Sequence, residues 1–284
     1  PVQYLGDTRT WTEGRRLSSI SHPAPGLPDY RTIHDYEYNA AGQRISKTTT
    51  SPIGDSVTTE FIYNGDQLVG QKTSDGSEDL VFLYDDAGSY IGFVYRNAEY
   101  YYMKNVQGDI IGIVDSAGSI LAIYVYNPWG RLVTIDRVTG SSYSDNGSSI
   151  GSINPIRYRG YYYDKETRLY YLNSRYYDPE VGRFLNADGE LAGIGGDICG
   201  YNLFSYCFNN PVNMDDPIGQ WPKWLTGALN VVSGALQMAA GAALGATVGW
   251  TGIGAVAAGF LIVNGASTVT QGIGQIVNDV TKSN

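Results

Sequence analysis

A short unit that joins two aromatic residues to a glycine turn recurs along the first half of the chain, and it constrains the fold more than any other feature. Its fullest copy, residues 36–45, reads Tyr-Glu-Tyr-Asn-Ala-Ala-Gly-Gln-Arg-Ile, and further copies begin at Phe61, Phe82 and Tyr124. Aromatic residues two apart lie on one face of a strand, Asn or Asp before Gly forms a turn, and the aliphatic residue starts the returning strand. We therefore predict successive β-hairpins that stack into one curved sheet.

Composition supports a mainly β chain. The 284 residues include 36 Gly and 24 Tyr, and only 17% are charged, which favours strands and turns over a helix bundle. An ordinary β-sandwich with coincidental turns is the alternative, and the regular spacing of the turn residues argues against it. The net charge of −9 gives no overall positive field for phosphates, so we expect no nucleic acid partner for this part of the chain.

A second feature is the tyrosine-rich stretch 158–177, which holds eight tyrosines in twenty positions with Arg and Lys interleaved. Tyrosine combines a large apolar ring with a polar tip, and it suits an interior that is both packed and wettable. Alternating tyrosines on strands usually pack within a sheet. A strip that binds sugar or nucleobase rings is the alternative.

Three runs of this region carry a resemblance to a known family. Residues 154–164 read Asn-Pro-Ile-Arg-Tyr-Arg-Gly-Tyr-Tyr-Tyr-Asp, and residues 169–184 read Leu-Tyr-Tyr-Leu-Asn-Ser-Arg-Tyr-Tyr-Asp-Pro-Glu-Val-Gly-Arg-Phe. Together with residues 201–219, they resemble the RHS-associated core domain of the RHS/YD-repeat family. The resemblance covers about residues 150–220, and it extends over residues 1–220 when the weaker repeats are included.

The resemblance implies a shell that contains and delivers a cargo. Residues 1–150 would form a YD-repeat β-hairpin spiral, 151–221 would close the shell, and 222–284 would begin a variable effector region. The chain would then be part of a secreted or cell-surface polymorphic toxin, with its own C-terminal effector segment as partner. The alternative is a surface adhesin whose tyrosines face outward to bind glycan or protein.

The run from Asp216 to Gly219 reads Asp-Pro-Ile-Gly, which by itself is typical of a type I turn. The resemblance implies more: Asp216 would pair with Asp188 as an aspartic autoprotease that cuts between Gly219 and Gln220. Two carboxylates within hydrogen-bonding reach cannot both ionise, so one holds a proton and the other activates water.

The chain departs from the family pattern at two places in this region. Residues 186–189 read Asn-Ala-Asp-Gly without the usual proline, and Gln220 is followed by Trp221 where the family typically has a leucine at the cleavage point. Asp197 and Asp215 are alternative members of the pair.

The remaining reactive side chains predict no further chemistry. Cys199 and Cys207 are expected to be buried free thiols. His22 and His34 lie far from the core motif in sequence, so neither is assigned a catalytic role. We expect no metal site and no cofactor.

The C-terminal part of the chain is uncharged from residue 224 to residue 278. Its apolar stretches 225–250 and 253–269 have lengths that suit a hydrophobic α-helical hairpin. Three interpretations remain open: a hairpin that inserts into a target-cell membrane through residues 225–269, an apolar plug stored in the shell, and a plain pair of core helices. Glycines every four residues would allow two helices to approach closely; they are Gly241, Gly245 and Gly249.

Overall fold

The computed structural model of the chain describes residues 2–4, 6–13, 16–24, 26–136, 142–143, 149–187, 202–212 and 216. The chain divides into two compact units, one formed by residues 1–187 and 204–219 and the other by residues 188–203 and 220–284. Every element described below belongs to the first unit. The expected helical hairpin after residue 222 lies outside the described residues.

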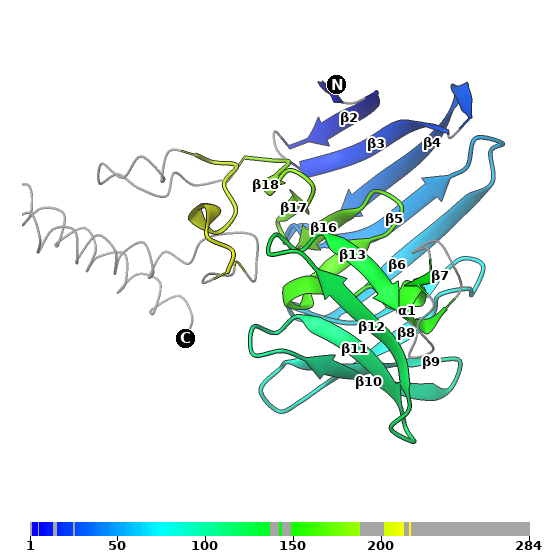
Figure 1. The fold of residues 1–284 in the computed structure, drawn as a ribbon. Helices are drawn as coiled ribbons and strands as arrows, with labels where there is room; N and C mark the ends of the chain where they lie inside the picture. The colour runs from blue at the N-terminus through cyan, green and yellow to red at the C-terminus, as the bar shows by residue number, and fades with distance from the viewer. Residues whose placement is uncertain are drawn as a thin grey trace, which may run out of the picture. The chain divides into compact units, whose positions relative to one another are not determined.

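The larger part of the first unit is a 14-stranded antiparallel sheet in which strands adjacent in sequence are adjacent in space (Figure 1). Its strands are β1 (Val2–Tyr4), β2 (Asp7–Thr12), β3 (Arg16–Ala24), β4 (Leu27–Tyr38), β5 (Arg44–Thr50), β6 (Ser56–Asn64), β7 (Gln67–Thr73), β8 (Leu80–Tyr84), β9 (Tyr90–Tyr95), β10 (Ala98–Lys104), β11 (Ile110–Asp115), β12 (Ile120–Tyr126), β13 (Leu132–Asp136) and β14 (Ser142–Tyr143). The prediction of a mainly β chain built from successive hairpins is confirmed.

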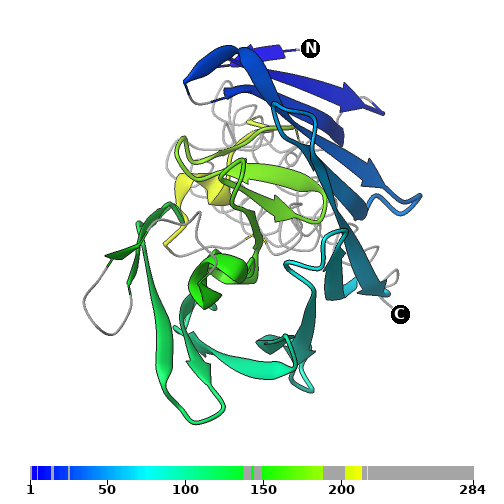
Figure 2. The same cartoon turned by 90° about the vertical axis from the view of Figure 1, so that its right-hand side faces the viewer.

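A smaller, four-stranded sheet follows in the chain. It is reached through the helix α1 (Ile150–Ile153) and the 3-10 helix η1 (Tyr158–Gly160), and a second 3-10 helix, η3 (Cys207–Asn209), comes after it. Its strands are β15 (Tyr162–Asp164), β16 (Leu169–Leu172), β17 (Arg175–Asp178) and β18 (Arg183–Phe184). Figure 2 shows the large sheet curving around this small one, and the two sheets share one hydrophobic core. We call the large sheet the wall and the small one the core sheet.

The recurring Asn or Asp of the sequence unit caps the hairpin turn. In the turn after β8, the Oδ1 of Asp85 accepts the backbone N–H groups of Ala87 and Ser89, at 3.0 and 2.8 Å. Gly88 follows with φ +77°, a left-handed conformation that glycine adopts without strain. The same side-chain bonds recur in the turns that begin at Asn105, Asp115 and Asn127.

The second aromatic residue of each unit ties one hairpin to the preceding one. The register of the wall shifts by a β-bulge immediately before these tyrosines, and bulges of this kind re-aim a side chain. Each hydroxyl then donates a hydrogen bond to a backbone carbonyl earlier in the wall. The bonds are Tyr38 to Leu17, Tyr63 to Arg44, Tyr84 to Leu68 and Tyr126 to Ile110.

Candidate functional site

The tyrosine-rich stretch lies in the interior, between the wall and the core sheet. Its eight tyrosines are each at most 8% exposed. Their rings contact the inner aromatics of the wall: Tyr162 meets Phe61 edge-on at 5.3 Å between centroids, and Tyr176 lies 5.3 Å from Tyr36. The prediction of sheet packing is confirmed, and these eight tyrosines do not form an exposed binding strip.

A cluster of four charged side chains, three of them buried, joins the wall to the core sheet. Asp164, at the end of β15, is fully buried; its Oδ2 lies 2.5 Å from Nη1 of Arg44, and its Oδ1 lies 3.0 Å from Nζ of Lys47. Lys47 also lies 3.1 Å from Oε2 of Glu166, in the turn after β15. Because Arg44 and Lys47 both come from β5, one strand of the wall holds the first hairpin of the core sheet.

Aromatic rings surround the guanidinium of Arg44. Its central carbon lies 4.4 to 5.8 Å from the centroids of five rings, those of Tyr36, Phe61, Tyr162, Tyr171 and Tyr176. A cation over a ring face contributes about 2 kcal/mol when both are desolvated. The Arg44 guanidinium therefore lies inside a cage of aromatic rings.

Lys47 and Glu166 keep each other ionised. Burial alone would lower the pKa of Lys47, but the carboxylates of Asp164 and Glu166 outweigh burial and raise that pKa well above its usual value. Burial alone would raise the pKa of Glu166, but the Lys47 ammonium beside it holds that pKa at about 2. Glu166 thus stabilises the fold above its unfolded pKa of 4.5, and this contribution is lost between about pH 4.5 and 2.

His34 lies near this cluster and is buried in its neutral form. The side chain is 1% exposed, its Nδ1 lies 2.9 Å from the hydroxyl of Thr49, and its ring stacks on that of His22 at 5.1 Å between centroids. Burial lowers the pKa of His34 from 6.5 to about 4. The unfolded chain therefore binds a proton at a pH where the folded chain does not.

We expect the free energy of unfolding to fall by about 3 kcal/mol as the pH drops from about 6.5 to about 4. The reason is that the pKa of His34 is about 2.5 units lower in the folded chain than in the unfolded chain. The loss begins near pH 6.5 and is complete near pH 4, below which both states hold the proton. Urea unfolding at a series of pH values measures it. His34→Gln should abolish the slope in this window, whereas His22→Gln should keep most of it; equal slopes in all three proteins would contradict the assignment.

Asp216 is buried against the core sheet. Its side chain is 0% exposed, and its Oδ2 lies 3.0 Å from Nη2 of Arg175, the first residue of β17. Its backbone N–H donates to the hydroxyl of Tyr161 at 3.1 Å, and that hydroxyl shares a hydrogen bond with Tyr206 at 3.2 Å. The predicted catalytic residue Asp216 is thus held in place from its side chain and from its backbone.

The chain that leads toward Asp188 is fixed to the same short segment. The Oδ1 of Asn186 accepts the backbone N–H of Tyr176 at 3.0 Å, and its Nδ2 donates to the carbonyl of Ser174 at 3.3 Å. These two bonds lie on either side of Arg175, which holds Asp216. The structure therefore brings Asp216 and Asn186, two positions before Asp188, to one short segment, residues 174–176 at the start of β17. Asp188 itself lies outside the described residues.

The segment before Asp216 is fastened to the wall by polar contacts. Nη2 of Arg159 donates to the carbonyl of Pro211 at 2.5 Å, and its Nη1 donates to that of Gln107 at 3.2 Å. The side chain of Gln107 in turn donates to the carbonyl of Val212 at 2.6 Å. These contacts fix the chain four residues before Asp216.

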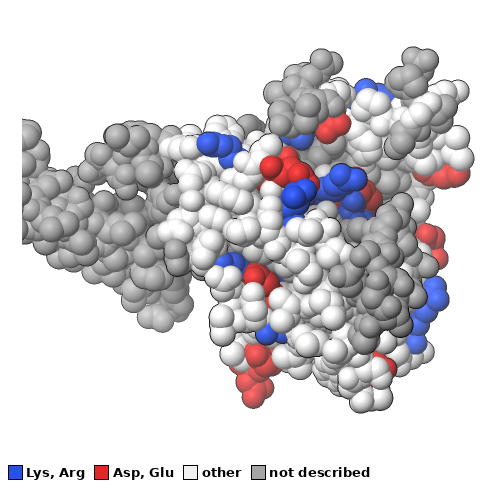
Figure 3. All heavy atoms as spheres, viewed as in Figure 1, with Lys and Arg blue, Asp and Glu red and all other residues white. Residues whose placement is uncertain are grey.

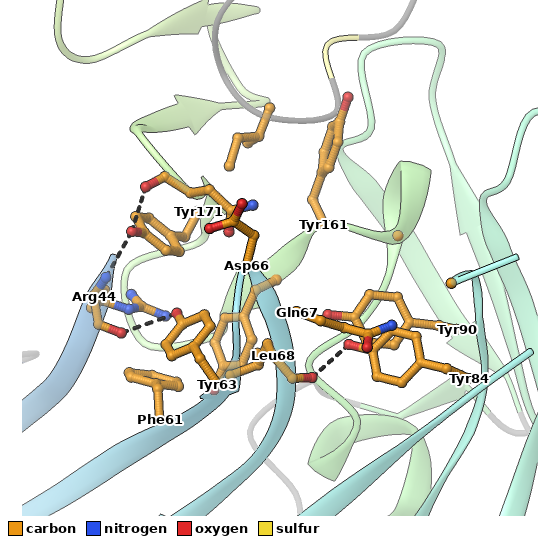
Figure 4. A pocket seen from close by; sticks show the side chains of 15 residues that line it. Arg44, Phe61, Tyr63, Asp66, Gln67, Leu68, Tyr84, Tyr90, Tyr161 and Tyr171 are labelled. Atoms are coloured by element: carbon orange, nitrogen blue, oxygen red, sulfur yellow. Dashed lines mark hydrogen bonds between the residues drawn. The ribbon is translucent and has the colours of Figure 1, made fainter. Parts of the chain in front are cut away.

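A pocket of about 350 Å³ opens between the wall and the core sheet (Figure 4). Its aromatic lining includes Tyr63, Tyr84 and Tyr90 from the wall and Tyr161 and Tyr171 from the core region. The hydroxyls of Tyr63, Tyr84 and Tyr171 each donate a hydrogen bond to a backbone carbonyl. Tyr161 connects the pocket to Asp216, because its ring lines the pocket and its hydroxyl accepts the Asp216 N–H.

Several predicted residues lie outside the described part of the chain. They are Asp188, Cys199, Gly219, Gln220, Gly241, Gly245 and Gly249. Cys207 is described; its side chain is buried and forms no disulfide, as predicted. Within the described ranges, no helix has the length and apolar character needed to cross a membrane, and no group of three or more potential ligands is placed to hold a metal ion. On the face drawn in Figure 3, acidic and basic side chains are intermixed among uncharged ones.

Sequence reasoning missed the buried charges. Arg44 stands two residues after the turn glycine, where other copies of the unit carry Tyr90, Ile110 and Leu132. This position points inward, so Arg44 is 1% exposed while the neighbouring Ile45 is 38% exposed. The sequence signal was a basic residue at the inward-facing position of the repeat. A buried cation at this position requires a buried carboxylate partner.

Comparison with known proteins agrees with this architecture. The chain is 34% identical over 220 residues to the tRNA3(Ser)-specific nuclease WapA of Bacillus spizizenii, a match that covers 77% of this chain and 8% of the relative. It is 28% identical over 209 residues to the double-stranded DNA deaminase toxin A of Burkholderia cenocepacia, covering 65% of this chain and 14% of that protein. The chain therefore spans a small part of the curated relatives that it matches.

A solved structure shows the same fold. The Photorhabdus luminescens Tc holotoxin pore aligns with a TM-score of 0.58 at 23% identity, over 76% of this chain and 10% of that one. The family model described as the teneurin YD-shell matches residues 31–212, which include most of the wall and the whole core sheet. The resemblance to YD-repeat proteins is thereby confirmed, and the chain belongs to the teneurin YD-shell family.

Proposed function

We propose that this chain is the shell portion of a secreted or cell-surface polymorphic toxin, which encloses and delivers a C-terminal effector. Residues 1–150 form its repeat wall, residues 151–221 close it, and residues 222–284 begin the effector region. The relatives named as a nuclease and as a deaminase toxin support this class of protein. The observation that carries the proposal is the core sheet, which is fastened to the inner side of a curved wall by buried ion pairs.

The burial of the tyrosines supports a container over an adhesin. An adhesin that binds glycan or protein through this stretch needs exposed rings, whereas the eight tyrosines of residues 158–177 are at most 8% exposed. Limited proteolysis of the full-length protein tests the proposal. A containing shell should protect the region after Gly219 until the wall is unfolded. Digestion of that region at the same rate in the folded and the unfolded protein would contradict containment.

The uncharged segment 225–269 is proposed as the part of the cargo that associates with the target membrane. Its length and its Gly241, Gly245 and Gly249 spacing support a helical hairpin in lipid. Partition of the isolated segment into liposomes tests this role; if it stays in solution, a plug within the shell or a pair of core helices is the better interpretation.

The second part of the proposal is self-cleavage between Gly219 and Gln220 by Asp216 and Asp188. In this reaction one carboxylate takes a proton from water while the water oxygen adds to the carbonyl carbon of Gly219. The other carboxyl group, which is protonated, gives its proton to the amide nitrogen of Gln220, and the C–N bond breaks. The products are a new carboxyl end at Gly219 and a new amino end at Gln220. The fixation of Asp216 and Asn186 around Arg175 supports this chemistry.

Intact mass measurement of the expressed chain tests self-cleavage. We expect two fragments that correspond to residues 1–219 and 220–284, and a single intact species for Asp216→Asn. Asp215→Asn tests the alternative member of the pair, and it should still cleave if Asp216 is the catalytic residue. A wild-type chain that stays whole after prolonged incubation would refute self-cleavage.

A further inference from the structure

The pocket between the wall and the core sheet offers aromatic surface to a ligand (Figure 4). Its partly exposed rings are those of Tyr63, Tyr84 and Tyr90, all from the wall. The hydroxyls of Tyr63 and Tyr84 donate to backbone carbonyls, at 3.0 and 2.5 Å, so their hydrogen atoms are already used within the wall. What these residues add to the pocket is largely apolar ring surface, which packs well against C–H groups.

Three polar side chains line the same pocket and keep hydrogen-bonding capacity that the fold does not use. Within the part of the chain that the structure describes, the side-chain amides of Gln67 and Asn173 make no hydrogen bond. The Oδ1 of Asp66 accepts from Nε2 of Gln43 at 3.1 Å, and its Oδ2 accepts from no described residue. Asp66 and Asn173 are exposed and Gln67 is half-buried, so a ligand in the pocket can reach all three.

The fold holds two of these groups in place before any ligand binds. Gln43, in the preceding hairpin turn, donates to the carbonyl of Gly65 at 2.9 Å as well as to Asp66. On the opposite side of the pocket, the hydroxyl of Tyr171 donates to the carbonyl of Asn173 at 2.6 Å. The turns that carry Asp66 and Asn173 are therefore fixed, and a ligand that binds to them loses little affinity to their ordering.

Charge and size restrict the class of ligand. The charged residues of the lining are Asp66 and Arg44, and the Arg44 guanidinium is buried and ion-paired with Asp164. The accessible charge is therefore negative, which disfavours phosphates and carboxylates. The volume of about 350 Å³ lies at the lower end of the range of about 300 to 1,000 Å³ for small-molecule sites. The pocket thus suits a small uncharged molecule rather than a length of chain.

We propose that this pocket binds a neutral pyranose ring of a saccharide. A pyranose presents C–H groups on the faces of its ring and hydroxyls around its edge, and each hydroxyl both donates and accepts hydrogen bonds. The C–H groups pack on the wall tyrosines, while the hydroxyls donate to Asp66 and exchange hydrogen bonds with the amides of Gln67 and Asn173. This site adds saccharide binding to the shell function proposed above and does not depend on self-cleavage.

Saturation-transfer difference NMR of the full chain tests the ligand class. The neutral probes are the methyl glycosides of glucose, galactose and mannose, and at least one of them should receive saturation on its ring protons. Methyl glucuronide has the ring of the glucoside with an added carboxylate, and it should fail to compete with the neutral glycosides. N-acetylarginine amide serves as the cationic probe.

Two substitutions test whether the bound glycoside lies in this pocket. Asp66→Asn keeps the shape of the side chain and removes its charge, which should weaken binding about tenfold, because a charged acceptor makes the stronger hydrogen bond. Asn173→Gly removes the amide at φ +57°, a conformation that glycine adopts without strain, and should weaken binding about fivefold. Asp55→Asn and Asn97→Gly make the same two changes at exposed positions outside the pocket, Asn97 having φ +63°, and should leave the affinity unchanged.

The outcomes separate this site from its alternatives. Weaker binding in both pocket variants, with unchanged controls, supports the saccharide site. Saturation transfer to no neutral glycoside overturns the proposal, and so does binding that survives both Asp66→Asn and Asn173→Gly. If N-acetylarginine amide binds instead and loses affinity in Asp66→Asn, the pocket takes a cationic side chain and the saccharide assignment is wrong. None of these results bears on containment, which protection from proteolysis tests separately.

Discussion

Asp164→Asn is expected to lower the free energy of unfolding by about 3 to 5 kcal/mol. The substitution keeps the size of the side chain but removes the negative charge that lies between Arg44 and Lys47, at 2.5 and 3.0 Å. Both cations would stay buried, and Glu166 would be the remaining anion of the cluster. Burying a charge without its partner is costly. Urea unfolding followed by tyrosine fluorescence measures the loss, because the cluster lies among tyrosine rings.

Two comparisons separate charge from shape in this experiment. Asp85→Asn makes the same chemical change at a turn where other copies of the unit already carry Asn, at positions 39, 105 and 127, so it should cost less than about 0.5 kcal/mol. Adding Arg44→Met to Asp164→Asn removes one of the two buried cations that have lost the Asp164 carboxylate. The double variant should therefore recover part of the lost free energy of unfolding. A loss below about 1 kcal/mol for Asp164→Asn would show that the cluster does not hold the core sheet on the wall.

The wall was predictable because each local signal points to the same structure. Asn or Asp at the start of the turn and Gly three residues later define the hairpin, and Asp85 with Gly88 shows how the two act together. The hydrogen bonds between hairpins were not predictable in the same way. Whether Tyr63 reaches the carbonyl of Arg44 depends on a bulge between Ile62 and Tyr63, and a bulge depends on the pairing of two strands.

The candidate site was predictable only in part for a similar reason. Asp216 was singled out by its motif, but Arg175 lies 41 positions earlier in the sequence, and no local pattern links the two. The anchoring of Asn186 beside Arg175 also follows from the packing of β17 rather than from sequence spacing. Contacts between residues that are distant in sequence can be identified only from the folded structure. A sequence pattern identifies only one of the two residues in such a contact.

Gly92→Ala is expected to destabilise the chain by about 3 kcal/mol, near the upper end of what overpacking usually costs. A Cβ atom at Gly92 would overlap the carbonyl oxygen of Tyr100 and would lie 3.1 Å from the Cα of Tyr101. Both contacts are with backbone atoms of β10, which is paired with β9 at this point. No side-chain rotation can relieve them, so the two strands must move apart and the hydrogen bonds between them must lengthen. The shift of the urea midpoint measures the cost.

A graded series of glycines isolates the effect of close approach. In Gly70→Ala the added carbon would lie 2.9 Å from the carbonyl oxygen of Leu80, so its cost should be smaller than that of Gly92→Ala. At Gly118 nothing lies within 4 Å, and the cost there is the strain of φ +81°, about 1 kcal/mol. If all three variants lost the same stability, the close approach of neighbouring strands would not explain the cost at Gly92 and Gly70. The predicted order instead makes the close approach of β10 to β9 the reason that residue 92 is a glycine.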